Sequence, residues 1–197
     1  MTTRRVVALP VGGANFGSLR RAFARLGQPI EFSRQASVLR AATHVVLPGV
    51  GAAAPAIAEL HAHGLVDVLR TLRQPLLGIC LGMQLLHEGS AEGEGEALGL
   101  LEGRALRLPP SPIWPHMGWN TVQRRGDLPL LDGIAEDEWF YFVHGYAVPA
   151  GTDTLASSDF GGPFAALVGR GNVFGCQFHP EKSAAAGRRL LANFLEL

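Results

Sequence analysis

The sequence contains little charge, few cysteines and no long apolar run. Lysine plus arginine and aspartate plus glutamate each number 17 in the 197 residues, so the chain has no electrostatic footprint for nucleic acid or an anionic membrane. Its two cysteines, Cys80 and Cys176, give no disulfide framework and fit a reducing, cytoplasmic setting in which a thiol can react. The apolar run 76–79 is too short to cross a bilayer, and the run 6–9 is too short for a signal-peptide core.

Strand-like and helix-like patterns alternate over the first two-thirds of the chain. This alternation predicts an α/β fold with a mostly parallel sheet flanked by helices. The expected strands are 5–9, 30–33, 44–47 and 76–79, and the expected helices are 15–26, 52–72 with a break at Gly64, and 81–88. The segment 89–137 is rich in Gly, Pro and acidic residues. Strand-like runs at 139–143, 154–158, 165–168 and 173–178 then predict an antiparallel extension, closed by a helix at 184–197. No linker divides the chain, so we expect a single domain over 1–197.

The strongest local signal for chemistry is the string Gly78-Ile79-Cys80-Leu81-Gly82. It lies where a predicted buried strand turns into a helix, which is the context of a nucleophile elbow. Flanking glycines allow the tight turn, and the positive end of the following helix favours a thiolate. The alternative is a small buried cysteine in a glycine-rich turn. We interpret Cys80 as a nucleophile.

A thiolate that attacks an amide needs a base, and His179 is the candidate among seven histidines. Glu181 follows it in His179-Pro180-Glu181 and can orient the imidazole, as in other nucleophile–base–carboxylate triads. The alternative is a loop histidine beside a solvated glutamate, and spacing alone does not establish a partnership with Cys80. A metal site is not expected, because Cys176-x-x-His179 would need two further ligands that the sequence does not offer.

Amide hydrolysis also needs donors for the developing oxyanion. The elbow supplies the N–H of Leu81, and the glycine-rich segment 48–51 after another strand can supply a second donor. The same segment invites a competing interpretation, because the string at 49–54 matches the dinucleotide pattern G-x-G-x-x-A. That fingerprint normally follows the first strand, whereas here it follows the third, so we favour the oxyanion role.

Together, these motifs resemble the class I glutamine amidotransferases. The strings at 78–86 and 177–181 carry the general resemblance. The string Pro115-His116-Met117-Gly118-Trp119-Asn120 and the segment 179–183 are similar to the glutaminase subunits of imidazole glycerol phosphate synthase in histidine biosynthesis. The segments 140–144 and 190–194 agree, so the resemblance covers almost the whole chain.

The resemblance implies an enzyme that hydrolyses glutamine to glutamate and ammonia with a Cys80–His179–Glu181 triad and no cofactor. It implies a heterodimer with a (β/α)₈-barrel cyclase, which uses the ammonia to make imidazole glycerol phosphate and an aminoimidazole carboxamide ribotide. The family positions that match imply an oxyanion strand, a substrate site and a partner interface. The implied oxyanion strand is Gly49, Val50 and Gly51. The implied substrate site is Gln84, Glu92, His144, Gly145 and Tyr146. The implied partner interface is Asn15, Trp119, Asn120 and Lys182.

Two positions depart from the family pattern. The opening 9–15 replaces an Asp-Tyr-Gly style sequence, and Gly145 stands where Ser or Thr is common. The extra freedom of a glycine predicts a looser carboxylate-binding loop. Two other functions remain open: a glutaminase that serves another ammonia-dependent synthase, and a non-catalytic amidotransferase-like binding module.

Overall fold

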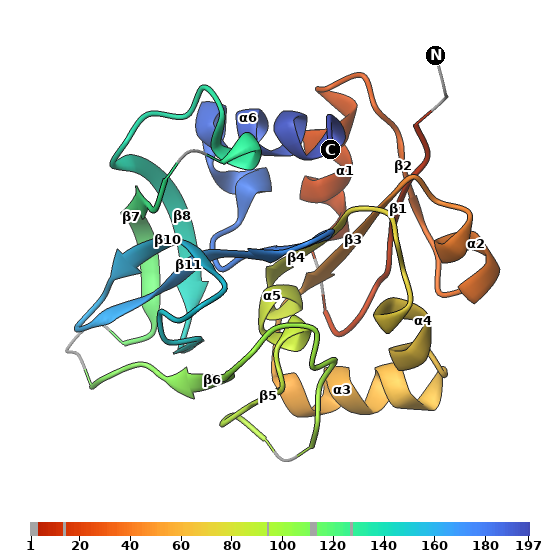
Figure 1. The fold of residues 1–197 in the computed structure, drawn as a ribbon, viewed down its shortest axis with the longest axis horizontal. Helices are drawn as coiled ribbons and strands as arrows, with labels where there is room; N and C mark the ends of the chain where they lie inside the picture. Colours follow the sequence, from red (N-terminus) through yellow and green to blue (C-terminus); the bar gives the residue numbers. More distant parts are fainter. Residues whose placement is uncertain (1–3, 14, 94, 111–113, 127) are drawn as a thin grey trace.

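The computed structural model describes residues 4–13, 15–93, 95–110, 114–126 and 128–197. A nine-stranded sheet in the order β2-β1-β3-β4-β12-β11-β10-β7-β8 forms the centre of the molecule (Figure 1). Its first five strands pair in parallel and the remaining pairs are antiparallel, so the sheet is mixed as the sequence predicts. The strand β12, expected in the antiparallel extension, instead pairs in parallel with β4 and joins the two parts of the sheet. These strands are β1 (Val6–Ala8), β2 (Ile30–Phe32), β3 (His44–Gly49), β4 (Leu76–Cys80), β7 (His116–Arg124), β8 (Glu138–His144), β10 (Thr154–Asp159), β11 (Pro163–Arg170) and β12 (Val173–Cys176).

Helices cover the two faces of the sheet in two groups. One face carries α1 (Phe16–Ala24) and α6 (Ala184–Leu195) with the 3₁₀ turns η1 (Pro129–Leu131) and η2 (Pro180–Lys182). The other face carries α2 (Ala36–Arg40), α3 (Ala53–Ala62), α4 (Val66–Arg70) and α5 (Leu81–Leu86). The short strands β5 (Gly89–Ser90), β6 (Arg104–Arg107) and β9 (Tyr146–Ala147) form a separate small sheet.

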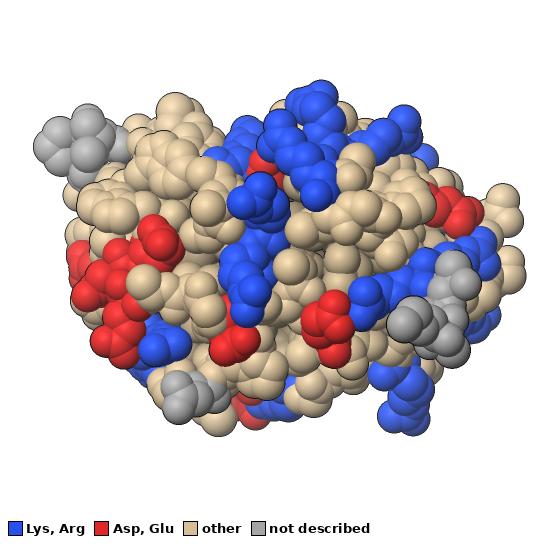
Figure 2. All heavy atoms as spheres, turned by 90° about the horizontal axis from the view of Figure 1, so that it is seen from above, with Lys and Arg blue, Asp and Glu red and all other residues tan. Residues whose placement is uncertain are grey.

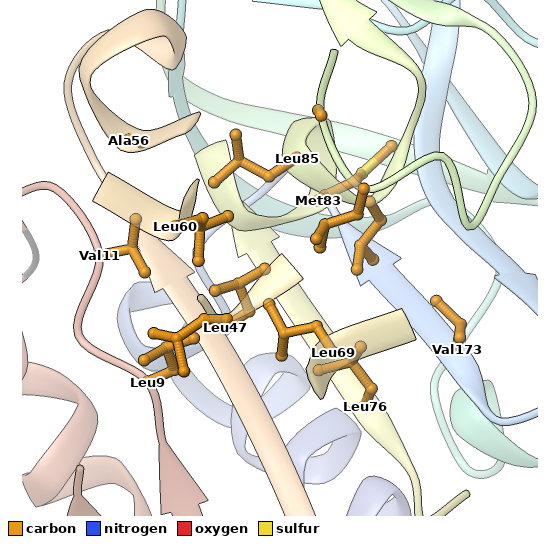
Figure 3. Close-up of a cluster of buried hydrophobic side chains, with 14 of the residues drawn as sticks. Leu9, Val11, Leu47, Ala56, Leu60, Leu69, Leu76, Met83, Leu85 and Val173 are labelled. Carbon is orange, nitrogen blue, oxygen red and sulfur yellow. The ribbon is translucent and has the colours of Figure 1, made fainter. Parts of the chain in front are cut away.

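Each face of the sheet has its own apolar core. The core beneath α3, α4 and α5 brings Leu47 and Leu76 from the strands against Leu60, Leu69 and Leu85 from the helices (Figure 3). The opposite core joins side chains of α1 and α6 to Phe140 and Phe142 of β8. Burial of the strands on both sides explains why their sequences are continuous apolar runs rather than alternating ones.

Several elements were absent from the sequence prediction, namely α2, β7, the short strands β5, β6 and β9, and the 3₁₀ turns η1 and η2. The five-residue helix α2 has no side-chain cap and only one buried residue, Leu39, so its sequence carries almost no helical signal. The nine-residue strand β7 alternates irregularly, because Met117 and Trp119 are exposed where a surface strand normally carries polar residues. In the part of the chain that the structure describes, no helix is long and apolar enough to cross a membrane.

Candidate active site

Cys80 lies at the sharp turn between β4 and α5. Its backbone has φ 53° and ψ −109°, a conformation that residues with a side chain rarely adopt and that is often found at functional sites. The glycines on either side permit close packing around this turn. A Cβ on Gly78 would lie 2.7 Å from the backbone of Gly82, and a Cβ on Gly82 would overlap the carbonyl oxygen of Leu47. The elbow that the sequence predicts is therefore present, and α5 begins directly after the thiol.

His179 follows β12, the strand next to β4, and Glu181 lies in the turn η2 after it. The His179 Nδ1 and Glu181 Oε1 atoms are 2.8 Å apart, and both side chains are buried. Among the described residues the Nε2 atom has no hydrogen bond, which leaves it available to the thiol. Burial would lower the pKa of His179, but the Cys80 sulfur and the Glu181 carboxylate outweigh it and raise this pKa to about 10. The ring is therefore a proton donor at neutral pH.

Gln177 is a neighbour of the thiol that the sequence analysis did not select. Its amide Nε2 lies 3.7 Å from Cys80 Sγ, and its Oε1 accepts from Gln84 Nε2 at 3.1 Å. The signal for it was the two-residue spacing from His179, since alternate residues of an extended segment project to the same side. Gln177 thus contacts the sulfur from the same segment that carries His179.

A cavity of ≈ 190 Å³ opens beside Cys80. Most of the predicted oxyanion and substrate residues line it together with Cys80 and Val143, and they come from segments far apart in the chain. They are Val50, Gly51, Leu81, Gln84, Glu92 and the segment 144–146. The volume suits a small polar molecule, and a thiol at its wall makes the cavity a candidate substrate site.

The glycine-rich segment after β3 forms the wall of the site nearest α5. Gly49 packs closely on the elbow, because a Cβ there would lie 3.1 Å from that of Leu81. The Val50 N–H donates to the carbonyl of Gly13 at 2.7 Å, and these two residues form an antiparallel bridge. This N–H is thus occupied in the present conformation. The predicted oxyanion segment lies beside the thiol with the Val50 donor engaged elsewhere.

Sequence comparisons agree with this geometry. A family model described as glutamine amidotransferase class-I matches residues 11–197. The subunit HisH of imidazole glycerol phosphate synthase from Xanthomonas axonopodis pv. citri is 51% identical over 194 residues, covering 98% of this chain and 97% of that protein. The same subunit from Vibrio cholerae is 46% identical over 203 residues, with 99% and 100% coverage.

The chain belongs to the class-I glutamine amidotransferase family.

Solved structures extend the likeness to the fold. A putative GMP synthase protein from Thermoplasma acidophilum superposes with a TM-score of 0.79 at 19% identity, over 100% of this chain and 94% of that one. A structure described as a glutamine amidotransferase gives 0.75 at 24% identity, with 97% coverage of both chains. The parallel sheet with its antiparallel extension is therefore the amidotransferase fold, and the predicted fold class is confirmed.

In this amidotransferase, Glu92 occupies the place that a dinucleotide phosphate would need. The first helical N–H of α3, at Ala53, donates to Glu92 Oε2 at 2.9 Å. A helix N-terminus next to a Gly-x-Gly turn is where a pyrophosphate binds in dinucleotide enzymes, and a carboxylate already satisfies it here. The competing interpretation of the segment 49–54 is therefore not supported. In the described residues no group of three or more His, Cys, Asp or Glu side chains is arranged to hold a metal.

A chain of hydrogen bonds fixes the opposite wall of the amidotransferase cavity. His144 Nδ1 donates to the carbonyl of Tyr146 at 2.9 Å, so its Nε2 accepts from His116 Nδ1 at 3.0 Å. His116 Nε2 then faces Asn120 Nδ2 at 3.3 Å. Burial lowers the pKa of His116 to about 4 and that of His144 to about 3, so both rings are neutral. Gln84 Nε2 also donates to the Tyr146 carbonyl, at 2.8 Å.

The four residues predicted to face a partner lie in three places. Asn15 caps α1, where its side chain accepts from the N–H of Ser18 at 3.1 Å. Trp119 is 48% exposed on β7, and the adjacent Asn120 donates to the carbonyl of Asp159 at 2.8 Å. Lys182 lies in η2 with its Nζ 5.5 Å from the centre of the Tyr141 ring. Ala14, in the atypical opening, lies outside the described residues.

We expect Glu181→Gln to reduce kcat for glutamine on the order of 10²-fold, because the imidazole loses the carboxylate that orients and charges it. The pKa of His179 should fall as well, because the Glu181 carboxylate no longer offsets the effect of burial, which lowers this pKa. The imidazolium would be lost at a lower pH, so the alkaline limb of the kcat/KM profile should move toward neutrality. The value of kcat at saturating glutamine measures the first effect, and a pH profile of kcat/KM measures the second.

The matched control for this prediction is Glu136→Gln, which removes an exposed carboxylate paired with Arg124 at 3.5 Å, away from the cavity. It should leave both the rate and the alkaline limb as in the wild type. An unshifted limb in Glu181→Gln would mean that Glu181 does not charge His179.

Proposed function

We propose that this amidotransferase hydrolyses glutamine to glutamate and ammonia and delivers the ammonia to a cyclase subunit. The cyclase would form imidazole glycerol phosphate and an aminoimidazole carboxamide ribotide, in the cytoplasm. The observation that carries the proposal is the buried His179–Glu181 pair beside a strained Cys80 at the wall of a cavity. The names of the relatives, which are subunits of imidazole glycerol phosphate synthase, support the choice of pathway. We further propose that residues 1–197 form one domain.

The proposed reaction uses the triad in two stages. Cys80 Sγ attacks the side-chain amide carbon of glutamine, and His179 carries the proton to the nitrogen, which leaves as ammonia. Water then attacks the glutamyl thioester, and His179 takes its proton and returns it to the sulfur. The Leu81 N–H, with Gly49, Val50 and Gly51, would stabilise the oxyanion in both stages.

We assign the far end of the cavity to the amino-acid end of glutamine. Glu92 would attract the ammonium group, and Gln84 would hold the cavity wall through the Tyr146 carbonyl. The backbone of the segment 144–146 would receive the carboxylate. Two hydrogen bonds to the Tyr146 carbonyl, from His144 and Gln84, support a rigid wall at this position.

We assign the cyclase interface to the surface that carries the exposed large apolar side chains of β7 and β8. Met117, Trp119 and Trp139 are 65%, 48% and 54% exposed, and such side chains are enriched in the centres of protein interfaces. Arg25, Lys182 and Arg188 line a hollow between α1 and η2 that adjoins Glu181. Figure 2 looks onto the α1 and α6 side and shows the basic side chains gathered there. A partner with acidic side chains beside an apolar patch, such as a (β/α)₈-barrel cyclase, would fit this surface, to which we also assign Asn15 and Asn120.

We expect the isolated subunit to hydrolyse glutamine poorly and the cyclase to stimulate it on the order of 10²-fold, which is what one oxyanion donor contributes. The reason is that the Val50 N–H is bound to the Gly13 carbonyl at 2.7 Å and must rotate away before it can serve the oxyanion. Ammonia release, measured with and without the cyclase and its nucleotide ligand, tests this. Equal turnover in both conditions would contradict it.

A second candidate is a glutaminase that serves another synthase, because the triad and cavity are independent of the acceptor. Co-purification with a different synthase and none with the cyclase would favour it. A third candidate is a non-catalytic binding module, which a lack of Cys80 labelling by an electrophilic glutamine analogue would favour.

A further inference from the structure

Gly145 is a glycine because an indole ring occupies the space of its side chain. A Cβ on Gly145 would lie 2.6 Å from Trp114 Cζ2 and 3.2 Å from Trp114 Cε2. Both distances are shorter than ordinary carbon–carbon contacts in a packed protein. The backbone of Gly145 is not in the left-handed region that favours glycine, since it is absent from the positive-φ residues of the described chain. The requirement at this position is therefore space for Trp114 rather than backbone freedom.

The ring of Trp114 is itself held in place. The Arg107 guanidinium lies over it at 4.7 Å from the ring centre, within the range of a cation–π contact. Arg107 ends β6, where it pairs with Tyr146 of β9, and the next residue, Leu108, donates its N–H to the Gly145 carbonyl at 2.9 Å. Trp114 and the end of β6 therefore hold Gly145 by its Cα and by its carbonyl.

These contacts lie directly behind the amidotransferase cavity. Gly145 lines the cavity between His144 and Tyr146, whereas Trp114 is outside it and 39% exposed. The His144 ring and the Tyr146 carbonyl are fixed by the hydrogen bonds of His116 and Gln84. Trp114 supplies the equivalent restraint for the middle residue, which has no side chain of its own to anchor.

We propose that Trp114 is a positioning residue for glutamine, which presses the Gly145 backbone into the conformation that receives the substrate's carboxylate. Trp114 and Gly145 act as a matched pair, in which the indole replaces the rigidity that a side chain at 145 would give. This inference rests on the proposed glutaminase function and adds a residue that touches no substrate atom. It reverses the expectation that Gly145 loosens the loop.

The pair can be tested with Trp114→Ala, Gly145→Ala and the double variant, each assayed as the complex with the cyclase. Each single change breaks the same contact, because the new Cβ in Gly145→Ala would push the exposed ring away. We expect either one to raise KM for glutamine about threefold to tenfold, the range of one packed aromatic contact, with a smaller change in kcat. The double variant should lose no more than the worse single variant, since the contact can be removed only once.

Two controls separate positioning from general damage. Gly151→Ala places a Cβ at an ordinary contact distance, 3.9 Å from the Pro149 carbonyl oxygen, and should leave KM unchanged. Alkylation of Cys80 by iodoacetamide, which needs no carboxylate site, should proceed at the wild-type rate in all variants. Binding of glutamine to the same variants in a Cys80→Ala background, measured by calorimetry, should weaken in parallel with KM.

An unchanged KM in Trp114→Ala, or losses that multiply in the double variant, would overturn the inference. A fall in kcat and in the alkylation rate with KM unchanged would also overturn it, because the ring would then act on the nucleophile. A wild-type complex without glutaminase activity would instead refute the proposed function, so the two failures are distinguishable.

Discussion

Replacing Cys80 with alanine is expected to abolish glutamine hydrolysis, with a loss of at least about 10⁴-fold in kcat, because no other group at the cavity wall can form the thioester. The fold should survive, since alanine is small enough for the elbow. Synthesis by the cyclase complex should therefore continue when free ammonia replaces glutamine. Ammonia release and product formation from each nitrogen source, measured side by side, test both parts.

Cys176 provides the control for this change, because it is the other cysteine and is fully buried in β12. Cys176→Ala should hydrolyse glutamine and should still be labelled by an electrophilic glutamine analogue, whereas Cys80→Ala should not be labelled. Glutaminase activity in Cys80→Ala within tenfold of the wild type would exclude Cys80 as the nucleophile.

Replacing Gly82 with alanine is expected to cause the largest loss of stability of any glycine-to-alanine change in this chain, because its Cβ would make the closest contact. The new Cβ would overlap the Leu47 carbonyl oxygen in strand β3, so either α5 must withdraw from the sheet or β3 must shift from its pairing with β4. We expect a loss of more than about 3 kcal/mol in the free energy of unfolding. In a chain of 197 residues this corresponds to a fall of roughly 10 °C in Tm.

Gly17→Ala is the matched control, since Gly17 also stands second in its helix, α1. Its nearest neighbour would be the flexible end of Arg21, at 3.3 Å, so alanine should be neutral or slightly stabilising. Thermal unfolding of both variants gives the comparison. Equal melting temperatures would show that α5 can withdraw from β3 at little cost.

The features that the sequence predicts well are those that depend on local chain geometry. The elbow at Cys80 follows from two glycines between a buried strand and a helix, and the pair His179 and Glu181 follows from a two-residue spacing. Their approach to Cys80 depends on β12 lying beside β4, which is a property of the sheet order. The family resemblance predicted that His179 and Glu181 pair with Cys80, whereas the spacing of residues in the sequence could not.

The features that could not be predicted from the sequence are contacts between residues far apart in the chain. Gly145 looked permissive because the ring that fills its space lies 31 residues away, at Trp114. The engagement of Val50 depends in the same way on Gly13, from a different segment. The strand β7 was missed because its exposed apolar side chains, Met117 and Trp119, which we assign to the partner, obscure the alternation of a surface strand.

The bridge between Gly13 and Val50 makes the activity of the enzyme without its partner depend on how the molecules divide between a form with this bridge closed and a form with it open. Each 1.4 kcal/mol in favour of the closed bridge reduces the competent fraction tenfold, and a shift from 1:99 to 99:1 needs a partner that binds the open form about 10⁴-fold more tightly. A partner could thus turn the enzyme on without touching glutamine. Conversely, any change that weakens this one hydrogen bond would let ammonia leak from the unpartnered subunit, wasting nitrogen.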